Sequence, residues 1–423
     1  MKDYQNWQYC TLGDVITLQR GFDLPERVRL HGRIPVVSSS GITGKHNLAK
    51  VKGPGVVTGR YGTLGEVFYI KKDFWPLNTT LFVKDFKKNN PLFISYFLKT
   101  LNLAHHSVAA AVPGLDRNAL HLLPVYLPPL PTQRKIAAIL SAYDDLIENN
   151  TRRIAILEEM AQSIYREWFV HFRYPGHEKN KMVESEMSMI PEGWEMTIVN
   201  EVFQILGGGT PSTKEIEYWD QGDINWYSPS DLTSAGTMFI KESTKKITTR
   251  GLRESSASMF PAYSVMMTSR ATIGVVSINT LPACTNQGFI TCLPNDKISA
   301  YQIYYWIVEN KEKINNIASG ATFKEINRTT FKQLSIILPN IEVSRLFNKT
   351  VEPIFKQIEN LIAKNINLRH TRDILLPKLV SGEIDVEKLN IAIPDIAEPA
   401  ELQDTPLMVP PEPIDATQLA LLF

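Results

Sequence analysis

Two long segments of the chain carry apolar residues at spacings of mostly three and four, which is the period of one helix face. The first segment runs from Thr132 to about Val170 without a proline or glycine, and the second runs from Val343 to Ser381-Gly382. Each pattern predicts a long helix with one apolar seam, and the simplest burial for two such seams is against each other. Asn150 falls inside the first seam, where a buried amide can fix the register of a helix pair.

The segments around these helices repeat each other in the same order, about 210 residues apart. Residues 120–128 align with residues 331–339, and residues 59–65 align with 269–274, so that Arg60 matches Arg270. Trp7 opens one copy and Trp194 opens the other. A period this long indicates duplicated domains rather than a solenoid. The two helices are antiparallel if the repeat keeps a two-fold relation, and a two-part ligand such as DNA with separated half-sites suits such a chain.

Each copy has the pattern of a mixed α/β domain. Short β-branched or aromatic runs at 56–58 and 67–70 predict strands, and residues 91–101 read as an amphipathic helix. The second copy repeats these features with strands at 265–268 and 275–278 and a helix at about 301–310. Between Gly207 and Gly236 the second copy carries an insert that reads as rich in loops.

The predicted fold class is α+β, with two similar mixed α/β domains separated by two long antiparallel, coiled-coil-like helices. The last segment is acidic and rich in proline, so we expect it to be mostly disordered. The predicted boundaries are a first domain at 1–130, a first long helix at 131–174, a linker at 175–189, a second domain at 190–340, a second long helix at 341–388 and a tail at 389–423.

The net charge of +1 hides a gradient along the chain. Residues 1–128 carry 16 Lys and Arg against 8 Asp and Glu, whereas residues 190–338 carry 13 against 14. The first domain could therefore hold phosphates by charge alone, and the second could do so only if its bases cluster. We expect Lys50, Lys52, Lys71 and Lys72 to face the phosphates in the first domain.

The cysteines and the hydropathy indicate the compartment. Cys10, Cys284 and Cys292 show no metal-ligand or disulfide spacing, which fits a reducing cytoplasm. We expect no signal peptide from the first residues, Met1-Lys2-Asp3-Tyr4, and no apolar run approaches the ~20 residues that span a bilayer. We expect a soluble, cytoplasmic protein with no membrane partner.

Motifs for catalysis are mostly missing from the sequence. There is no phosphate loop, no dinucleotide fingerprint and no tetrapeptide of the kind that holds a flipped base for methylation. A nuclease-like spacing at Asp296, Glu309 and Lys311 falls partly in a helical pattern, where that metal site needs a strand. His105 and His106 read as surface residues. We expect no catalytic residue and no metal site in this chain.

Two groups of short sequence words resemble a known family. Residues 208–214, GGTPSTK, are followed by Glu217-Tyr218-Trp219, Gly222-Asp223-Ile224 and Trp226. Residues 127–137, LPPLPTQRKIA, lead into Leu157-Glu158-Glu159. Both groups, in this order and repeated, resemble the specificity subunits of type I restriction–modification systems over residues 1 to about 388. The pattern departs from the family at Arg20-Gly21-Phe22 in the first copy and at 339–342 in the second.

The resemblance implies a DNA sequence-specificity subunit without catalytic activity of its own, working within a type I restriction endonuclease and adenine-type methyltransferase. Each target-recognition domain would read one half of a bipartite, asymmetric site in double-stranded DNA, while the helices set the spacing. It implies two modification subunits, which bind S-adenosylmethionine and dock on the helices, and restriction subunits, which use ATP and Mg²⁺. It implies no cofactor in this chain.

Candidate DNA-binding residues are those in the predicted loops whose side chains pair with base edges and phosphates. Arg60 and Arg270 are the strongest, because the alignment gives them matching places after a strand and before a glycine turn. Asn78 and Asn286 also correspond, and we expect them to brace turns. The candidates are Ser38, Ser39, Lys45, His46, Arg60, Tyr61 and Arg117 in the first domain, and Ser228, Ser230, Asp231, Ser269, Arg270, Gln287, Lys324 and Arg328 in the second.

Two other functions compete with this one. A self-contained DNA methyltransferase or nuclease would need the catalytic motifs that the sequence lacks. A coiled-coil scaffold without nucleic-acid specificity would leave two large, diverged, loop-rich domains unexplained.

Overall fold

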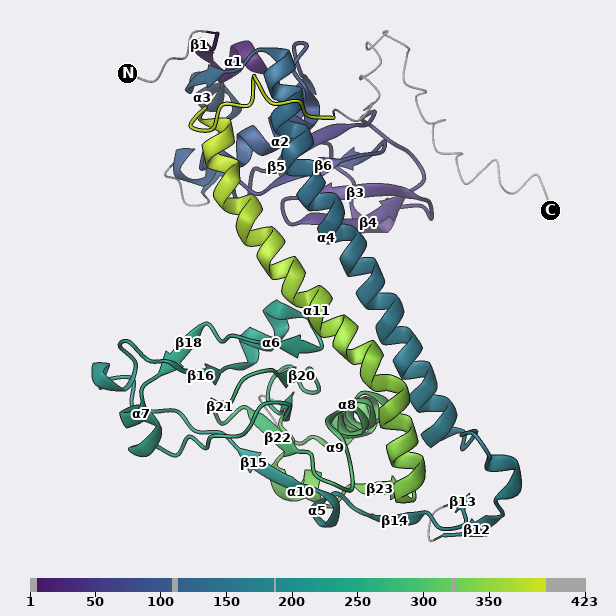
Figure 1. The fold of residues 1–423 in the computed structure, drawn as a ribbon. Coiled ribbons are helices and arrows are strands. Elements are labelled where there is room, and N and C mark those ends of the chain that lie inside the picture. Colours follow the sequence, from purple (N-terminus) through teal and green to yellow (C-terminus); the bar gives the residue numbers. More distant parts are fainter. Residues whose placement is uncertain (1–5, 109–112, 186–187, 321–323, 393–423) are drawn as a thin grey trace, which may run out of the picture. The chain divides into compact units, whose positions relative to one another are not determined.

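The computed structural model of the chain describes residues 6–108, 113–185, 188–320 and 324–392 (Figure 1). The chain divides into two compact units. Unit 1 holds the residues up to Tyr143 together with those from Thr371 onward, and unit 2 holds Asp144–His370. The predicted disordered tail lies outside the described residues from position 393 on.

The described residues of unit 1 form two small sheets and two strand pairs. An antiparallel sheet runs in the order β2-β8-β5-β6, a second sheet runs in the order β4-β3-β7, and β9 pairs with β10. Strand β1 pairs antiparallel with β11, which brings the two ends of the domain together. The strands are β1 (Gln8–Thr11), β2 (Thr17–Arg20), β3 (Ile34–Ser38), β4 (Gly41–His46), β5 (Gly55–Gly59), β6 (Val67–Ile70), β7 (Trp75–Pro76), β8 (Thr80–Asp85), β9 (Ser107–Val108), β10 (Gly114–Leu115) and β11 (Pro124–Leu127).

Helix α2 (Pro91–Thr100) packs on strands β5 and β6 of unit 1. It begins where Asn90 caps it, with Asn90 Oδ1 accepting from the Phe93 amide at 2.9 Å, and Pro91 occupies its first turn. Residues 91–98 are all buried, so α2 is a core helix of this unit. The other helical segments are α1 (Leu12–Val15), η1 (Glu26–Val28), η2 (Leu103–His106) and α3 (Arg117–His121).

Unit 2 repeats this arrangement with additions. Its main sheet runs β15-β22-β19-β20-β17, its smaller sheet runs β18-β16-β21, and β14 pairs antiparallel with β23. The strands are β12 (Met182–Glu184), β13 (Met189–Pro191), β14 (Glu195–Ile198), β15 (Gln204–Gly207), β16 (Ile224–Tyr227), β17 (Phe239–Ile240), β18 (Lys245–Ile247), β19 (Val265–Thr268), β20 (Val276–Asn279), β21 (Ala283–Thr285), β22 (Phe289–Leu293) and β23 (Ser335–Leu338).

Helix α8 (Ala300–Glu309) is the counterpart of α2 and packs on β19 and β20. The shorter helical segments of unit 2 are η4 (His177–Lys179), α5 (Val199–Val202), η5 (Ile216–Tyr218), α6 (Pro229–Ala235), α7 (Thr249–Arg253), α9 (Lys311–Ile317) and α10 (Arg328–Lys332). The predicted strands at 56–58, 67–70, 265–268 and 275–278 and both predicted domain helices are thus confirmed.

Two segments contain more regular structure than their sequences suggested. The insert between Gly207 and Gly236 holds strand β16, whose residues 225–227 are buried, and helix α6. The segment 175–189 holds η4 and β12, and β12 pairs antiparallel with β13. The sequence pattern did not predict these elements, because a short strand or a single helical turn has too few apolar positions to show a period.

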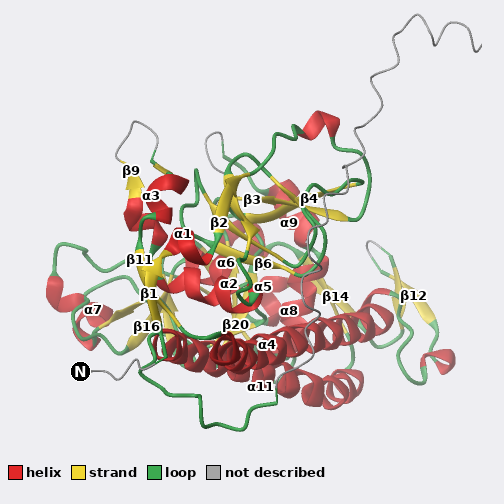
Figure 2. Cartoon of the chain, turned by 90° about the horizontal axis from the view of Figure 1, so that it is seen from above, coloured by secondary structure: helices red, strands yellow, loops and turns green. Residues whose placement is uncertain are grey.

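Helix α4 (Leu130–Tyr165) continues into a π-helical turn at Arg166–Val170, and α11 spans Ile341–Val380. In unit 2 the ring centroid of Tyr165 lies 6.0 Å from that of Phe347, and Asn150 Nδ2 donates to Asn365 Oδ1 at 2.9 Å. Residue numbers therefore increase along α4 in the direction in which they decrease along α11, so the two helices are antiparallel, and they lie side by side (Figure 2). In unit 1, Ile136 and Leu140 share a core with Leu379 and Val380. The predicted antiparallel pair and the buried Asn150 are confirmed.

The start of α4 shows why the sequence there is LPPLPTQ. Gln133 is buried, and its Nε2 donates to the Pro128 carbonyl at 2.9 Å and to Asn89 Oδ1 at 2.8 Å. Its Oε1 accepts from the Asn90 amide at 3.0 Å. One side chain therefore ties the end of β11 and the cap of α2 to the long helix.

Candidate nucleic-acid interface

Backbone hydrogen bonds fix the residue-by-residue correspondence between the two domains. The Arg60 amide donates to the Thr79 carbonyl at 2.9 Å, and the Ser269 amide donates to the Gly288 carbonyl at 2.8 Å. The Arg60 carbonyl accepts from Leu115 at 3.0 Å, just as the Ser269 carbonyl accepts from Ile326 at 3.0 Å. Arg60 therefore corresponds to Ser269.

This register corrects the alignment made from the sequence. Tyr61, not Arg60, corresponds to Arg270, and the two arginines do not occupy matching places. The same offset follows from the turn, because Gly65 donates to Gly59 at 3.2 Å and Gly274 donates to Thr268 at 3.0 Å. Matching arginine to arginine misplaced the alignment by one residue, because side-chain identity was weighed above the backbone register.

The register reveals a different pair of matching arginines. Since Leu115 corresponds to Ile326, Arg117 corresponds to Arg328. Each is the first residue of a short helix that follows a capping residue. Before Arg117, Asp116 Oδ1 accepts from the Asn118 amide at 2.9 Å, and before Arg328, Asn327 Oδ1 accepts from the Thr330 amide at 2.8 Å. Both arginines are exposed. The Arg328 guanidinium lies over Gly207, where an added Cβ would be 2.7 Å from its Cζ.

Pairs of serines end equivalent strands in the two units. The Val37 carbonyl accepts from Leu77 at 2.8 Å and the Tyr227 carbonyl accepts from Asn286 at 3.0 Å, so Ser38 corresponds to Ser228. The hydroxyl oxygens of Ser38 and Ser40 are 3.0 Å apart, and those of Ser228 and Ser230 are 2.8 Å apart. Sequence reasoning missed Ser40, which only this shared register could have identified.

Glycine marks the same close backbone approach in both units. A Cβ at Gly21 would lie 2.2 Å from the Leu77 carbonyl oxygen, and a Cβ at Gly208 would lie 2.0 Å from the Asn286 carbonyl oxygen. The motifs Arg20-Gly21-Phe22 and Gly207-Gly208-Gly209 therefore have glycine at their central position for the same steric reason, since a side chain there would clash with the neighbouring backbone.

Substituting this glycine will strongly destabilise unit 1. We expect Gly21→Ala to lower the free energy of unfolding by on the order of 2–3 kcal/mol, because the new methyl group meets backbone that must shift. Gly44→Ala is the matched control in the same unit, since its Cβ would meet only Arg29 Nη1 at 3.1 Å. Urea denaturation of both variants compares them, and equal stabilities would contradict the argument.

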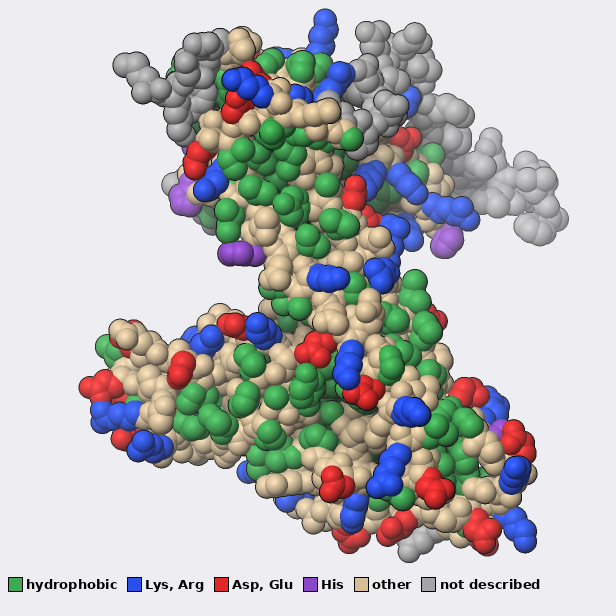
Figure 3. Space-filling view, viewed as in Figure 1, with side chains coloured by type: hydrophobic (Ala, Val, Ile, Leu, Met, Phe, Trp, Pro, Cys, Tyr) green, Lys and Arg blue, Asp and Glu red, His purple; other side chains and the backbone are tan. Residues whose placement is uncertain are grey.

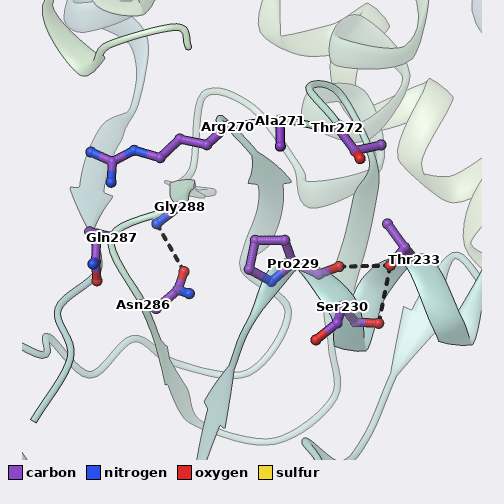
Figure 4. Close-up of a pocket in the computed structure, with 9 residues that line it drawn as sticks. All are labelled: Pro229, Ser230, Thr233, Arg270, Ala271, Thr272, Asn286, Gln287 and Gly288. Atoms are coloured by element: carbon purple, nitrogen blue, oxygen red, sulfur yellow. Dashed lines mark hydrogen bonds between the residues drawn. The ribbon is translucent and has the colours of Figure 1, made fainter. Parts of the chain in front are cut away.

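In unit 2 the equivalent loops surround a surface hollow of about 360 Å³ (Figure 4). Asn286 Oδ1 accepts from the Gly288 amide at 2.9 Å, so Asn286 braces its turn, as expected from the sequence. Its counterpart in unit 1 is Leu77 and not Asn78, because the Leu77 and Asn286 amides make the equivalent bonds, so that part of the sequence alignment is wrong. Gln287 is exposed, and its Oε1 accepts from Thr210 Oγ1 at 2.6 Å. The hollow is lined by Pro229, Ser230, Thr233, Arg270, Ala271, Thr272, Asn286, Gln287 and Gly288.

The loops of unit 1 carry different side chains at the same places. The Arg60 guanidinium lies 4.5 Å from the centre of the Tyr61 ring, a cation–π arrangement. The Tyr61 ring fills the space beside Gly114, where a Cβ would be 2.4 Å from Tyr61 Cε1. Ser39 lies beside the same loop, 3.3 Å from where a Cβ of Gly62 would be. Arg20 stands where unit 2 has Gly207, because β2 and β15 pair in the same register.

Three of the candidate residues are buried and hold the framework. His46 is 4% exposed, and its Nδ1 accepts from the Leu30 amide at 3.0 Å. Ser269 is 2% exposed. Asp231 is 7% exposed and accepts from the amides of Ser228 at 2.7 Å and Thr244 at 2.8 Å. Burial raises the pKa of the Asp231 carboxyl, but hydrogen bonds from Ser228 and Thr244 outweigh burial and hold this pKa below its usual value.

The basic residues divide between two ends of unit 1. Lys45 pairs with Pro35 near the start of β3, whereas Ser38 ends that strand. Lys52 precedes β5, and Lys71 and Lys72 follow its partner β6, so they lie at the opposite end of this hairpin from Arg60. These three lysines therefore do not belong to the set of loops that contains Arg60. In unit 2, Lys324 lies beside Arg270, since its carbonyl accepts from the Ala271 amide at 3.3 Å.

The residues considered for catalysis have structural surroundings. Glu309 Oε1 accepts from Gln162 at 2.7 Å and from Arg166 at 2.8 Å, which ties α8 to α4. His105 and His106 are exposed. Within the described ranges, no group of three or more His, Cys, Asp or Glu side chains could hold a metal ion. Among the helices of the described residues, none has the length and apolar character needed to cross a membrane.

Comparisons with known proteins agree with this architecture. Residues 4–159 and 191–370 match the family described as type I restriction modification DNA specificity domain. The chain is 26% identical over 337 residues to the type I restriction enzyme HindI specificity subunit of Haemophilus influenzae, covering 66% of this chain and 72% of that protein. It is 23% identical over 421 residues to the MjaVIII specificity subunit of Methanocaldococcus jannaschii, covering 91% and 95%.

A solved structure shares the fold. The S subunit of a type I restriction–modification system from M. genitalium superposes with a TM-score of 0.58 at 16% sequence identity, covering 88% of this chain and 96% of that one. The α+β fold predicted from the sequence, with two similar domains and two long antiparallel helices, is confirmed by the elements of both units. Since the family match takes in both copies of the repeat and most of the chain, this protein belongs to the type I restriction modification DNA specificity domain family.

Proposed function

We propose that this chain is the DNA sequence-specificity subunit of a type I restriction–modification complex, and that each unit reads one half of a bipartite DNA site. The observation that supports this most directly is the matched hydrogen-bond register of the two loop sets. The same backbone frame presents different side chains in each unit, such as Tyr61 against Arg270 and Arg20 against Gly207. A shared frame suits the same docking on duplex DNA, and different side chains suit two different half-sites.

We assign DNA contacts to the exposed or half-exposed loop residues of each unit. His46, Ser269 and Asp231 support these loops from within, and Lys45 lies away from them. The proposed contact residues are Arg20, Ser38, Ser39, Ser40, Arg60, Tyr61 and Arg117 in unit 1, and Ser228, Ser230, Arg270, Gln287, Lys324 and Arg328 in unit 2.

The long helices are proposed to set the spacing between the half-sites and to dock two modification subunits. Helices of 36 and 40 residues measure about 54 and 60 Å at a rise of 1.5 Å per residue. In unit 2 these helices also expose large apolar side chains, among them Leu146 at 52%, Ile156 at 57% and Ile366 at 50%. Such side chains suit contact with another protein. The chemistry would belong to modification subunits with S-adenosylmethionine and restriction subunits with ATP and Mg²⁺.

Selection from a random DNA pool tests the proposal. The full chain, assembled with its modification subunits, is expected to recover sequences with two fixed segments separated by an unspecified gap of constant length. A single contiguous motif, or no motif, would contradict the reading of one half-site by each unit.

The salt dependence of DNA binding will separate the two basic surfaces of unit 1. Changing Arg20, Arg60 and Arg117 together to Gln should make the negative slope of log K against log[salt] shallower by ~0.9 for each phosphate that the protein no longer neutralises. Changing Lys52, Lys71 and Lys72 to Gln removes the same charge at the other end of the β5–β6 hairpin and should leave the slope near wild type. The reverse result would place the DNA on the lysine surface.

Unit 2 has no excess of basic over acidic residues, so we expect a few individual side chains to contribute most of its DNA binding. On the face seen in Figure 3, Lys and Arg side chains of unit 2 are interspersed with Asp and Glu. Residues 190–338 carry 13 basic and 14 acidic residues, so this unit has no excess positive charge to attract DNA. Its binding must depend on specific contacts made by a few well-placed basic side chains such as Arg270.

A further inference from the structure

We propose that Arg270 reads a guanine in the half-site bound by unit 2, and that Glu325 positions it for this contact. The inference rests on the proposed function and adds to it a base, a reading residue and a positioning residue.

Arg270 and Glu325 are placed side by side by their backbones. The two residues form an antiparallel β-bridge, which sets their side chains next to each other. Arg270 Nε donates to Glu325 Oε1 at 2.7 Å. Their side chains are 46% and 39% exposed, so the pair lies at the surface, where a ligand can reach it.

The carboxylate partner stands on a fixed backbone. The Glu325 amide donates to the Ser319 carbonyl at 2.9 Å, and its own carbonyl accepts from the Ser319 amide at 3.0 Å. On either side of the pair, Ile326 donates to Ser269 at 3.0 Å, and Ala271 donates to the Lys324 carbonyl at 3.3 Å. Glu325 therefore holds the guanidinium from a defined direction and reduces the rotamer freedom that DNA binding would otherwise remove.

The geometry of the pair suits guanine. Guanidinium has five donors in a planar fork, and the contact with Glu325 uses Nε. The two terminal nitrogens are left to face a partner with two adjacent acceptors. In the major groove guanine offers this pair, N7 and O6, and adenine offers only one acceptor beside a donor. Figure 4 shows the Arg270 guanidinium on the same side of the hollow as Gln287.

The other unit lacks this device at the same place. Tyr61 corresponds to Arg270. Gly114 corresponds to Glu325, because Gly114 directly precedes Leu115, which donates to the Arg60 carbonyl, and Glu325 directly precedes Ile326, which donates to the Ser269 carbonyl. Tyr61 has one hydroxyl and no fork, and its ring fills the space that Gly114 leaves. The guanine contact therefore belongs to one half-site only.

A phosphate would also accept from a guanidinium, and the repeat helps to separate the two ligands. Arginine occurs in both units at 117 and 328, as expected for a contact with the backbone common to all DNA. Arg270 occurs in unit 2 alone and has a carboxylate partner at Nε, which would repel a phosphate bound at the neighbouring terminal nitrogens. These features favour a base for Arg270.

Selection and affinity measurements on the full chain in its complex test the proposal. Arg270→Lys keeps the charge and removes the fork, so guanine preference at one position of one half-site should fall by about 5- to 150-fold, with the other positions unchanged. Glu325→Ala should weaken the same preference, and Glu325→Gln, which still accepts from Nε, should restore part of it. Arg253→Lys, an exposed arginine on α7, is the control.

The outcomes separate this inference from the proposed function. If the wild-type complex selects a bipartite motif but Arg270→Lys leaves every base preference intact, Arg270 contacts phosphate or nothing and the inference is wrong. An equal decrease in affinity for all sequences overturns it as well. If the wild-type complex selects no motif, the proposed function fails first.

Discussion

Replacing residues 1–130 by the equivalent segment of another family member will change one half of the recognised DNA sequence and leave the other half unchanged. Unit 1 has its own core, in which Leu12, Phe93 and Leu120 are fully buried. Its loops are anchored by hydrogen bonds that stay within the unit, such as that from Leu115 to Arg60. The half-site proposed for unit 2 depends on residues that the exchange leaves in place.

The structure shows what an exchange must preserve. The core of unit 1 includes Ile136 and Leu140 of α4 together with Leu379 and Val386, which lie outside the exchanged segment. Lys135 Nζ donates to the carbonyls of Glu387 at 2.6 Å and Leu389 at 3.0 Å. A second chimera that also takes the donor's residues 131–143 and 371–392 keeps this core intact and controls for misfolding.

Sequencing of modified bases in cells that carry each chimera gives the result directly. Exchange of 190–340 is the reciprocal experiment and should change only the other half. If both halves change after one exchange in a folded, assembled chimera, the assignment of one half-site to each unit is wrong.

The long helices were predictable because their signal is long. A period of three and four residues over almost 40 positions gives many independent apolar sites, and it placed the start of each helix within one residue, whereas α11 ends at Val380, before the predicted boundary at 388. Asn150 could be recognised as a polar residue in the seam. Its partner Asn365 could not, because the pairing depends on which residues of α11 lie opposite, and one seam alone does not determine that register.

The sequence singled out some residues that the structure brings together and others that it does not. In unit 2, Ser230, Arg270 and Gln287 line one hollow. The pairing of Arg60 with Arg270 failed, because the correspondence follows backbone hydrogen bonds that an alignment of side-chain types does not see. His46 and Asp231 have the same side-chain chemistry as ligand-binding residues, and only burial distinguishes their framework roles.

The departure of the second copy from the family words also has a physical explanation. In unit 1 a glutamine on the long helix, Gln133, reaches the cap of α2. In unit 2 the glutamine is on α8, where Gln302 Nε2 donates to Ser344 Oγ of α11 at 2.7 Å. The domain helix and the long helix stay hydrogen-bonded in both units, but the glutamine changes sides. The glutamine motif at the start of the long helix is therefore absent from the second copy, although a hydrogen bond still joins the domain helix to the long helix there.

The amide pair between α4 and α11 predicts a strong and non-additive effect on stability. Asn150 is 9% exposed and Asn365 is 3% exposed, and Asn150 Nδ2 donates to Asn365 Oδ1 at 2.9 Å. Asn150→Leu leaves the Asn365 carbonyl oxygen buried without this donor, which should destabilise the chain by on the order of 1–3 kcal/mol. Asn365→Leu should destabilise the chain within the same range and by more than Asn150→Leu, because it leaves Asn150 Nδ2 buried without its acceptor.

The double variant with leucine at both positions should be more stable than either single variant. Two apolar side chains of similar volume replace a matched polar pair, so no buried polar group of this pair is left without a partner. The destabilisations of the two single variants should therefore not add, and the difference measures the coupling between the side chains. Asn365 Nδ2 also lies 3.3 Å from Thr151 Oγ1, so its nitrogen keeps a neighbour when Asn150 is replaced and the first variant should be the milder.

Asn149→Leu is the matched control, because it changes the same residue type one position earlier on an exposed part of α4. Urea denaturation of the three leucine variants, the control and the wild type, followed by helix circular dichroism, gives the comparison. Since the chain has two units, the midpoints should be compared within the same transition rather than converted from a single two-state fit. If Asn150→Leu were no less stable than Asn149→Leu, the amide would not contribute to pairing, and the register of the helices would have to come from their apolar contacts, such as that of Tyr165 with Phe347.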